Sequence, residues 1–171
     1  MDIFVEHIVK HKRNLKDNLI AVGVILAAII LGAVLFLLSF GFGFPQIGLL
    51  LVAGVFYAAY KIATFTSVEY EYILTNNELD IDKIMARTRR KRIMTIDFKS
   101  IVLCAPVNDS EYKHELEDKS ITINYDFTGQ GYNPAYFIIC DGEKGRMRVL
   151  FEPTEKIIEN ASKFNPRKVI R

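Results

Sequence analysis

Residues 19–60 read LIAVGVILAAIILGAVLFLLSFGFGFPQIGLLLVAGVFYAAY, a run without Asp, Glu, Lys, Arg or His. An α-helix rises about 1.5 Å per residue, so about 20 apolar residues cross a hydrocarbon core of about 30 Å. The run is long enough for two such helices, and a Gly-Phe-Gly-Phe-Pro segment at residues 41–45 separates them. The sequence therefore predicts a protein that is integral to a membrane, with two spans.

The two predicted spans cover about residues 19–42 and 46–65, and because so few residues join them we expect an antiparallel helical hairpin. Small residues recur at four-residue spacing in each span, which favours close approach of helix backbones. These residues are Ala28 and Gly32 in the first span, and Gly54 and Ala58 in the second. We expect them at a helix-packing interface, within a hairpin unit of residues 18–66.

Basic residues flank the predicted hairpin on both sides, whereas its connecting loop carries no charge. They are Lys10, Lys12, Arg13 and Lys16 before the hairpin, and Lys61 and the segment 87–92 after it. Cytoplasmic flanks of membrane helices are enriched in Lys and Arg. The sequence therefore predicts a multi-pass protein of the cell membrane, with both termini and the larger domain in the cytoplasm.

The first 17 residues show apolar and histidine side chains at helical spacing, with lysines around them. The positions are Phe4, Ile8, His11 and Leu15. This pattern predicts a short amphipathic cytoplasmic helix over residues 1–17. Two interpretations are open: the helix lies in the headgroup layer with its lysines towards anionic lipid, or it is a solvated leader without a separate role.

From residue 67 the spacing of the apolar residues changes from that of a helix to a period of two, which is typical of strands. The strand-like segments lie at about residues 68–74, 79–82, 91–96, 100–107, 120–127, 135–140 and 146–151. An Asn76-Asn77 pair between the first two segments suits a tight turn. After Pro153, an amphipathic helix with Ile157, Ile158, Ala161 and Phe164 on one face ends before Pro166. The prediction is seven strands, as four and then three, and one C-terminal helix.

This order of elements resembles the pleckstrin-homology-like (PH-like) fold, two nearly orthogonal sheets with a helix that closes one open end. The complete layout resembles uncharacterised bacterial proteins that carry two transmembrane helices and a cytoplasmic PH-like domain. The motifs of this second resemblance are YEYILTNNELDI at residues 70–81, FEP at 151–153 and NPRK at 165–168. The fold resemblance implies binding of lipid or protein rather than catalysis. It assigns residues 67–171 to a cytoplasmic PH-like domain with a short C-terminal tail.

The sequence contains few of the residue patterns that a catalytic or metal site requires. The histidines His7, His11 and His114 are scattered, and the Glu that follows His114 lacks the second histidine that a zinc-protease helix needs. Cys104 and Cys140 lie in apolar stretches without CxxC spacing, so we expect buried, reduced thiols. The sequence thus predicts no catalytic residue, no cofactor and no metal ion.

The strongest local signal is a basic cluster between the second and third predicted strands. It contains Arg87, Arg89, Arg90, Lys91 and Arg92. The formal net charge of the chain is only +2, which argues against a nucleic-acid partner. In an antiparallel meander that starts directly after the second span, the turn between strands two and three returns to the membrane end. Each basic residue close to an anionic leaflet contributes about 1 kcal/mol, so these five residues are candidates for lipid contact.

A competing interpretation of the basic cluster is open. The long connection between the fourth and fifth predicted strands also falls at the membrane end, and it is acidic at Asp109, Glu111, Glu115, Glu117 and Asp118. These carboxylates could pair with the arginines and leave a solvated, locally neutral surface.

Together these features predict a membrane-anchored, non-enzymatic binding or scaffold protein. Its PH-like domain is expected to present a surface at the cytoplasmic membrane face to a protein partner or to anionic lipid headgroups. The alternative is an accessory subunit of a membrane transport or secretion complex that assembles through the transmembrane hairpin.

Overall fold

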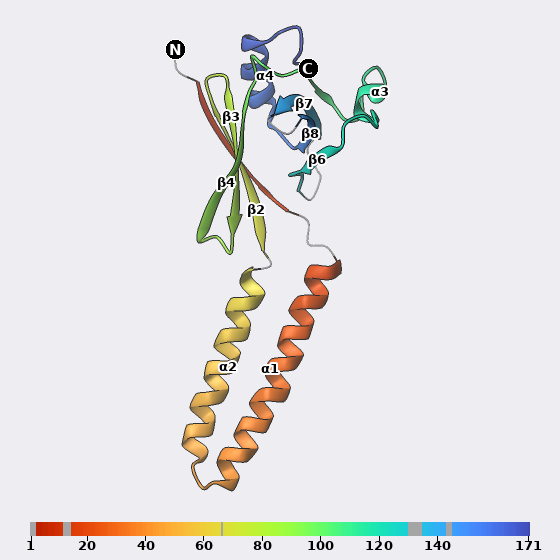
Figure 1. The fold of residues 1–171 in the computed structure, drawn as a ribbon. Helices are drawn as coiled ribbons and strands as arrows, with labels where there is room; N and C mark the ends of the chain where they lie inside the picture. Colours follow the sequence, from red (N-terminus) through yellow and green to blue (C-terminus); the bar gives the residue numbers. More distant parts are fainter. Residues whose placement is uncertain (1–2, 12–14, 66, 130–134, 143–144) are drawn as a thin grey trace. The chain divides into compact units, whose positions relative to one another are not determined.

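The computed structural model describes residues 3–11, 15–65, 67–129, 135–142 and 145–171. The chain divides into two compact units (Figure 1). One unit is a domain built from Met1–Lys12 and Val68–Arg171, and the other is a helical hairpin within Arg13–Ser67. The hairpin is therefore inserted into the sequence of the domain, whereas the sequence predicted that it precedes the domain.

The hairpin consists of α1 (Leu15–Gly41) and α2 (Pro45–Phe65), which confirms the two predicted helices. Both helices are long and apolar enough to cross a membrane. Pro45 opens α2, where its missing N–H leaves no intrahelical hydrogen bond unmade. Gly43 in the connection has a φ angle of 78°, which glycine adopts without steric cost. Only 11% of the apolar window of each helix is buried within the structure, so most of this surface requires an apolar environment from outside the chain.

The two helices meet partly through the predicted small residues. Ala28 and Ala59 are buried, and a Cβ atom added to Gly32 would lie 3.6 Å from an α2 side chain. Ala58 is exposed at the rim of the interface, and a Cβ atom added to Gly54 would meet nothing within 4 Å. The first predicted pair thus packs against α2, whereas Gly54 does not pack against α1.

The domain begins with a strand where the sequence predicted a helix. β1 (Phe4–Lys10) pairs antiparallel with β2 (Val68–Thr75) over its whole length. The prediction of an amphipathic helix over residues 1–17 is therefore wrong for residues 4–10, which form β1. Residues 12–14 lie outside the described part of the chain. Residues 4 and 8 share one face in a helix and also in a strand, so their spacing did not distinguish the two. The partner strand that decides the conformation follows only after the hairpin.

β3 (Glu78–Met85) and β4 (Arg89–Asp97) complete the first sheet, which is antiparallel and has the order β1-β2-β3-β4. Asn76, in the turn between β2 and β3, has a φ angle of 54°, as the predicted tight turn requires. In the next turn Ala86 and Arg87 adopt φ angles of 51° and 57°.

The second sheet has the order β5 (Leu103–Pro106), β7 (Tyr136–Gly142), β8 (Gly145–Phe151) and β6 (Ile123–Asp126). Its strands are antiparallel neighbours, except that β6 runs parallel to β8. The described residues thus form two sheets of four strands, where the sequence predicted four and three. The additional strand is β1, and the fourth predicted strand joins the second sheet as β5.

The core of the domain lies between the two sheets. α4 (Glu155–Phe164) confirms the predicted C-terminal helix, and its Ile157, Ile158 and Ala161 are buried in this core. At the centre, the Tyr72 hydroxyl donates a hydrogen bond of 2.7 Å to the Phe127 carbonyl oxygen. The helix and both sheets therefore share one apolar cluster, as the PH-like fold requires.

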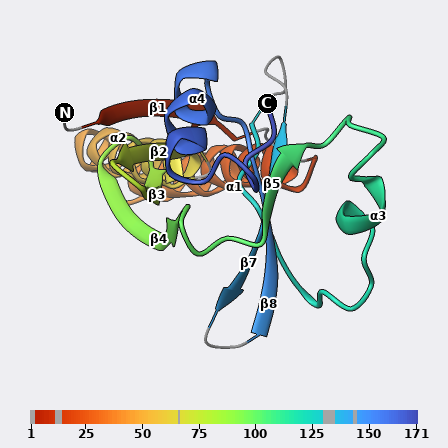
Figure 2. The same cartoon turned by 90° about the horizontal axis from the view of Figure 1, so that it is seen from above.

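A second, smaller cluster covers the other face of the second sheet. Phe137 and Ile139 of β7 are buried there against Ile121 and the partly buried Leu116. Leu116 belongs to α3 (Lys113–Leu116), a short turn in the connection between β5 and β6. Figure 2 shows α3 and α4 on opposite sides of β7 and β8. Burial on both faces explains why β7 is a continuous apolar run without alternation.

Candidate functional site

The basic cluster lies in β4 and in the turn that precedes it. Val68, at the start of β2, pairs with Met85, and Lys10, at the end of β1, pairs with Glu69. The turn at residues 86–88 is therefore at the end of the first sheet from which both links to the hairpin leave. We call this end, marked by Lys10, Val68 and the 86–88 turn, the connection end. Its position within the domain agrees with the strand order expected from the sequence.

Three arginines of the cluster form ion pairs with acidic residues of neighbouring strands. Arg92 Nη2 lies 2.9 Å from Asp80 Oδ2, and Arg92 Nε donates a hydrogen bond of 3.1 Å to Asp82 Oδ1. This hydrogen bond is the main reason why the pKa of Arg92 is raised. Arg87 Nε lies 3.3 Å from Glu69 Oε1.

Arg90 contacts three carboxylates at once. It forms an ion pair with Glu71, its Nε lies 3.7 Å from Asp82 Oδ2, and its Nη2 lies 3.7 Å from Glu6 Oε1. For Arg87, Arg90 and Arg92 the structure gives no ion pair with the described 109–118 segment. For these three residues the described structure thus shows pairing within the sheet, and not the pairing with the 109–118 segment that was one of the two open interpretations.

The carboxylates beneath these arginines are unusually well buried. The side chain of Glu71 is 1% exposed and that of Asp82 is 5% exposed, although both project from the face opposite the main core. The guanidinium groups of Arg90 and Arg92 contact these carboxylates while about half of each arginine side chain stays exposed, since arginine can bury part of its side chain and keep its charge in solvent. The result is a compact charged layer of paired side chains on the outer face of the first sheet.

Arg89 and Lys91 belong to the other face of the sheet, because side chains alternate along β4. Lys91 lies directly opposite Lys83 of β3, and Arg89 lies opposite Met85. Neither lysine forms an ion pair in the described part of the chain. Like charges directly opposite each other destabilise a sheet, so this pair favours an anion nearby. The five predicted lipid-contact residues are thus divided between a neutralised face and a basic one.

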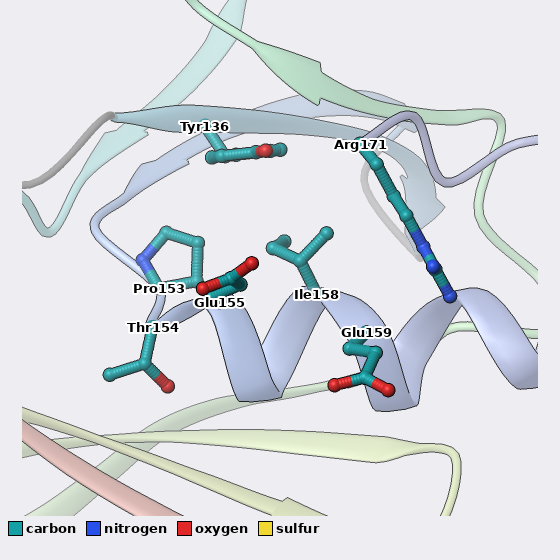
Figure 3. Close-up of a pocket in the computed structure, with 7 residues that line it drawn as sticks. All are labelled: Tyr136, Pro153, Thr154, Glu155, Ile158, Glu159 and Arg171. Atoms are coloured by element: carbon teal, nitrogen blue, oxygen red, sulfur yellow. The ribbon is translucent and has the colours of Figure 1, made fainter.

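A pocket of about 540 Å³ lies beside the start of α4 (Figure 3). Its lining residues are Tyr136, Pro153, Thr154, Glu155, Ile158, Glu159 and Arg171. The ring of Tyr136 lies across the pocket from Pro153 and Ile158 (Figure 3). The pocket therefore combines an aromatic and aliphatic lining with acidic and basic groups.

In the described part of the chain the histidines and cysteines do not gather into a metal-binding group. His7 and His11 lie at β1 and His114 lies in α3, and among the described residues no group of three or more His, Cys, Asp or Glu side chains could hold a metal ion. Cys104 and Cys140 are buried free thiols, as predicted. Burial raises the pKa of both thiols, which disfavours the reactive thiolate.

Sequence reasoning missed two sets of side chains. Lys83 did not stand out from the alternating residues of β3, because its importance depends on the register with β4. Tyr136 lies in an apolar run without alternation, so no sequence pattern indicated the pocket that it lines. Glu155 and Glu159 carried a signal, since residues four apart share one face of the predicted helix.

Comparisons with known proteins place the chain in a family. The search of curated proteins and the search of solved structures each gave no match. A family model described as "Bacterial PH-like domain (DUF6106)" matches residues 1–171. The match spans β1, the hairpin and both sheets, so it includes the insertion of the hairpin into the domain. The chain belongs to this bacterial PH-like domain family.

Proposed function

We propose that this protein is a membrane-anchored, non-enzymatic binding module whose PH-like domain presents its connection end to the anionic headgroups of the cytoplasmic membrane face. The observation that supports it most is the cross-strand pair of Lys83 and Lys91, which lacks an acidic partner in the described residues. The hairpin supplies the anchor, because α1 and α2 are long and apolar enough to cross a membrane. Both termini are cytoplasmic in this arrangement.

The geometry of the sheet limits which basic residues serve this role. Arg90 and Arg92 form ion pairs with buried carboxylates. Lipid contact through these two arginines would therefore break the ion pairs that neutralise Glu71 and Asp82. Lys83 and Lys91 occupy the other face without an ion pair in the described residues, and the side chain of Arg87 in the turn is 72% exposed although it pairs with Glu69. Each basic residue near an anionic surface contributes about 1 kcal/mol within a Debye length of about 8 Å. This set can therefore orient the domain, while the hairpin retains the protein in the membrane.

The test uses the full chain, because a fragment of residues 67–171 lacks β1. The natural sequence contains no Trp, so a single Trp introduced by Thr88→Trp reports on the connection end. Glu78→Trp is the matched control, because the eight residues of β3 separate the two positions by about 26 Å. In lipid nanodiscs with a dansyl-labelled headgroup, energy transfer from position 88 should exceed that from position 78.

Two comparisons separate a headgroup contact from simple tethering. Replacing anionic lipid by neutral lipid, or introducing Lys83→Glu and Lys91→Glu, should decrease energy transfer from position 88. Lys119→Glu and Lys156→Glu, at two exposed lysines away from this sheet, form the control pair and should leave it unchanged. Equal energy transfer in all these samples would refute the lipid contact.

A protein partner is the second candidate, and the free edge of β4 favours it. β4 is the last strand of its sheet, and a groove of about 540 Å³ runs beside Ile93–Asp97. Such an edge can accept an extended segment of another protein. A photo-crosslinker at Thr95 should then capture a partner in native membranes, whereas one at Lys119 should not.

The hairpin supports the alternative of an accessory subunit in a transport or secretion complex. Gly54 leaves open space on α2, which a partner helix could approach closely. Gly54→Ile should dissociate such a complex in native membranes without loss of the domain fold. Gly23→Ile on α1, where an added Cβ atom also meets nothing within 4 Å, is the control. Retention of the complex in the Gly54→Ile protein would exclude this interface.

A further inference from the structure

We infer that the pocket beside α4 binds a primary alkylammonium group, supplied either by a free polyamine or by a lysine side chain of a partner. The site is distinct from the basic connection end and does not depend on the proposed lipid contact. The site is formed by four of the side chains that line the pocket: Tyr136 with its ring and hydroxyl, Glu155 and Glu159 with their carboxylates, and the aliphatic Ile158.

Tyr136 contributes an aromatic ring and a hydroxyl group to the wall of the pocket. The residue is only 9% exposed, and its hydroxyl has no hydrogen bond in the described part of the chain. A buried polar atom of the lining without a hydrogen-bond partner in the described residues is Thr154 Oγ1, whereas the Tyr136 hydroxyl borders the open space of the pocket and is available to a ligand there. Phe151 meets the Tyr136 ring at an interplanar angle of 68° on the core side, and Figure 3 shows the ring across the pocket from Ile158.

The acidic groups lie on the helix side of the pocket. Glu155 and Glu159 are one helical turn apart, and neither forms an ion pair in the described residues. Arg171, the basic group of the lining, is held at the far end because its Nε and Nη2 donate hydrogen bonds of 3.0 and 2.6 Å to Ser162 Oγ. The charged lining groups thus carry two negative charges and one positive charge.

These groups select a cation of a particular kind. The face of an aromatic ring attracts cations, and two unpaired carboxylates add to this attraction, whereas an anion would be repelled by both. Two carboxylates alone are too few for a metal site, and the described residues include no group of three metal-ligating side chains. Pro153 and Ile158 provide an apolar surface for the methylene groups of an alkyl chain. A volume of about 540 Å³ is in the range of small-ligand pockets.

The test measures binding to the full chain in neutral-lipid nanodiscs at low salt by calorimetry. Spermidine represents the free polyamine, and Nα-acetyl-lysine methylamide represents a lysine side chain. We expect saturable one-to-one binding of at least one of the two probes. The probe that binds more tightly identifies the source, because the two share only the alkylammonium group.

Variants test whether this pocket is the site. Glu155→Gln and Glu159→Gln should each weaken binding about fivefold, and Tyr136→Phe, which keeps the ring, should weaken it about threefold. Glu115→Gln with Glu117→Gln, an exposed acidic pair at α3, is the control and should bind as the parent does. Circular dichroism verifies that each variant is folded. No binding of either probe, or equal binding by the Glu155→Gln/Glu159→Gln protein and the parent, would overturn the inference.

Discussion

Glu71 and Asp82 lie directly opposite each other across β2 and β3, and both side chains are almost completely buried. Two like charges at this distance would destabilise the sheet if no cation lay between them. Arg90 contacts both carboxylates, and Arg92 contacts Asp82 a second time. The basic cluster therefore has a structural role in the sheet, in addition to any role on the surface.

Removal of Arg90 should reveal that role. We expect Arg90→Gln to lower the free energy of unfolding of the domain by about 2–3 kcal/mol, because two buried carboxylates lose their shared cation. Urea unfolding of the full chain in detergent, followed by circular dichroism, measures the loss. Lys91→Gln, at the adjacent exposed residue, should change stability by less than about 0.5 kcal/mol. Glu71→Gln with Asp82→Asn in the Arg90→Gln background should recover most of the loss, and a similar effect of Arg90→Gln and Lys91→Gln would contradict the assignment.

His7 should make stability depend on pH. Its Nε2 atom is buried without a hydrogen-bond partner in the described residues, and burial lowers the pKa of its imidazole from 6.5, with Glu152 opposing the shift. The unfolded chain therefore binds a proton at His7 more readily than the folded domain does. The contribution of His7 to the free energy of unfolding is fully present above about pH 6.5 and decreases as the pH falls below it. Urea unfolding at pH 7.5 and 5.5 measures this decrease. It should be smaller in His7→Gln and unchanged in His114→Gln, whose histidine is exposed in α3.

The strand at the N-terminus can be tested by two neighbouring substitutions. Val9 is buried in the core between the sheets, whereas Ile8 projects to the outer face and is 49% exposed. Val9→Asp should therefore destabilise the domain by about 3 kcal/mol or more, and Ile8→Asp by less than about 1 kcal/mol. Thermal unfolding of the full chain measures both effects. Equal effects would contradict the alternation that defines β1.

The sequence was sufficient for those elements whose signal is local. The uncharged run predicted α1 and α2, the alternation in β2 and β3 predicted a meander, and the apolar face of residues 155–164 predicted α4. β1 could not be predicted in this way, because its conformation depends on β2, which follows after the hairpin. A local pattern does not contain the identity of a distant hydrogen-bonding partner.

The candidate sites show the same limit. Arg87, Arg90 and Arg92 were recognised as part of a basic cluster, but the two partners considered for it were anionic lipid and the 109–118 segment, not the carboxylates of β2 and β3. Charge patterns give the sign of a surface, whereas the partner of each charge depends on strand register. The role of Tyr136 as a pocket residue could not be predicted for a related reason. A strand that is buried on both faces has no alternation of apolar and polar residues, so the sequence does not indicate which face borders a pocket.

The hairpin contains a close contact near its connecting loop that small substitutions should disturb. A Cβ atom added to Gly48 of α2 would lie 2.8 Å from the Cβ atom of Ser39 in α1, closer than side chains normally approach. The Ser39 hydroxyl is fixed there by a hydrogen bond of 2.7 Å to the Phe36 carbonyl oxygen. Gly48→Val should therefore lower hairpin stability by about 1–3 kcal/mol, measured as faster hydrogen exchange of the α2 amides in detergent. Gly54→Val, at a position with open space, should exchange as the parent does, and equal exchange in both variants would contradict this helix contact.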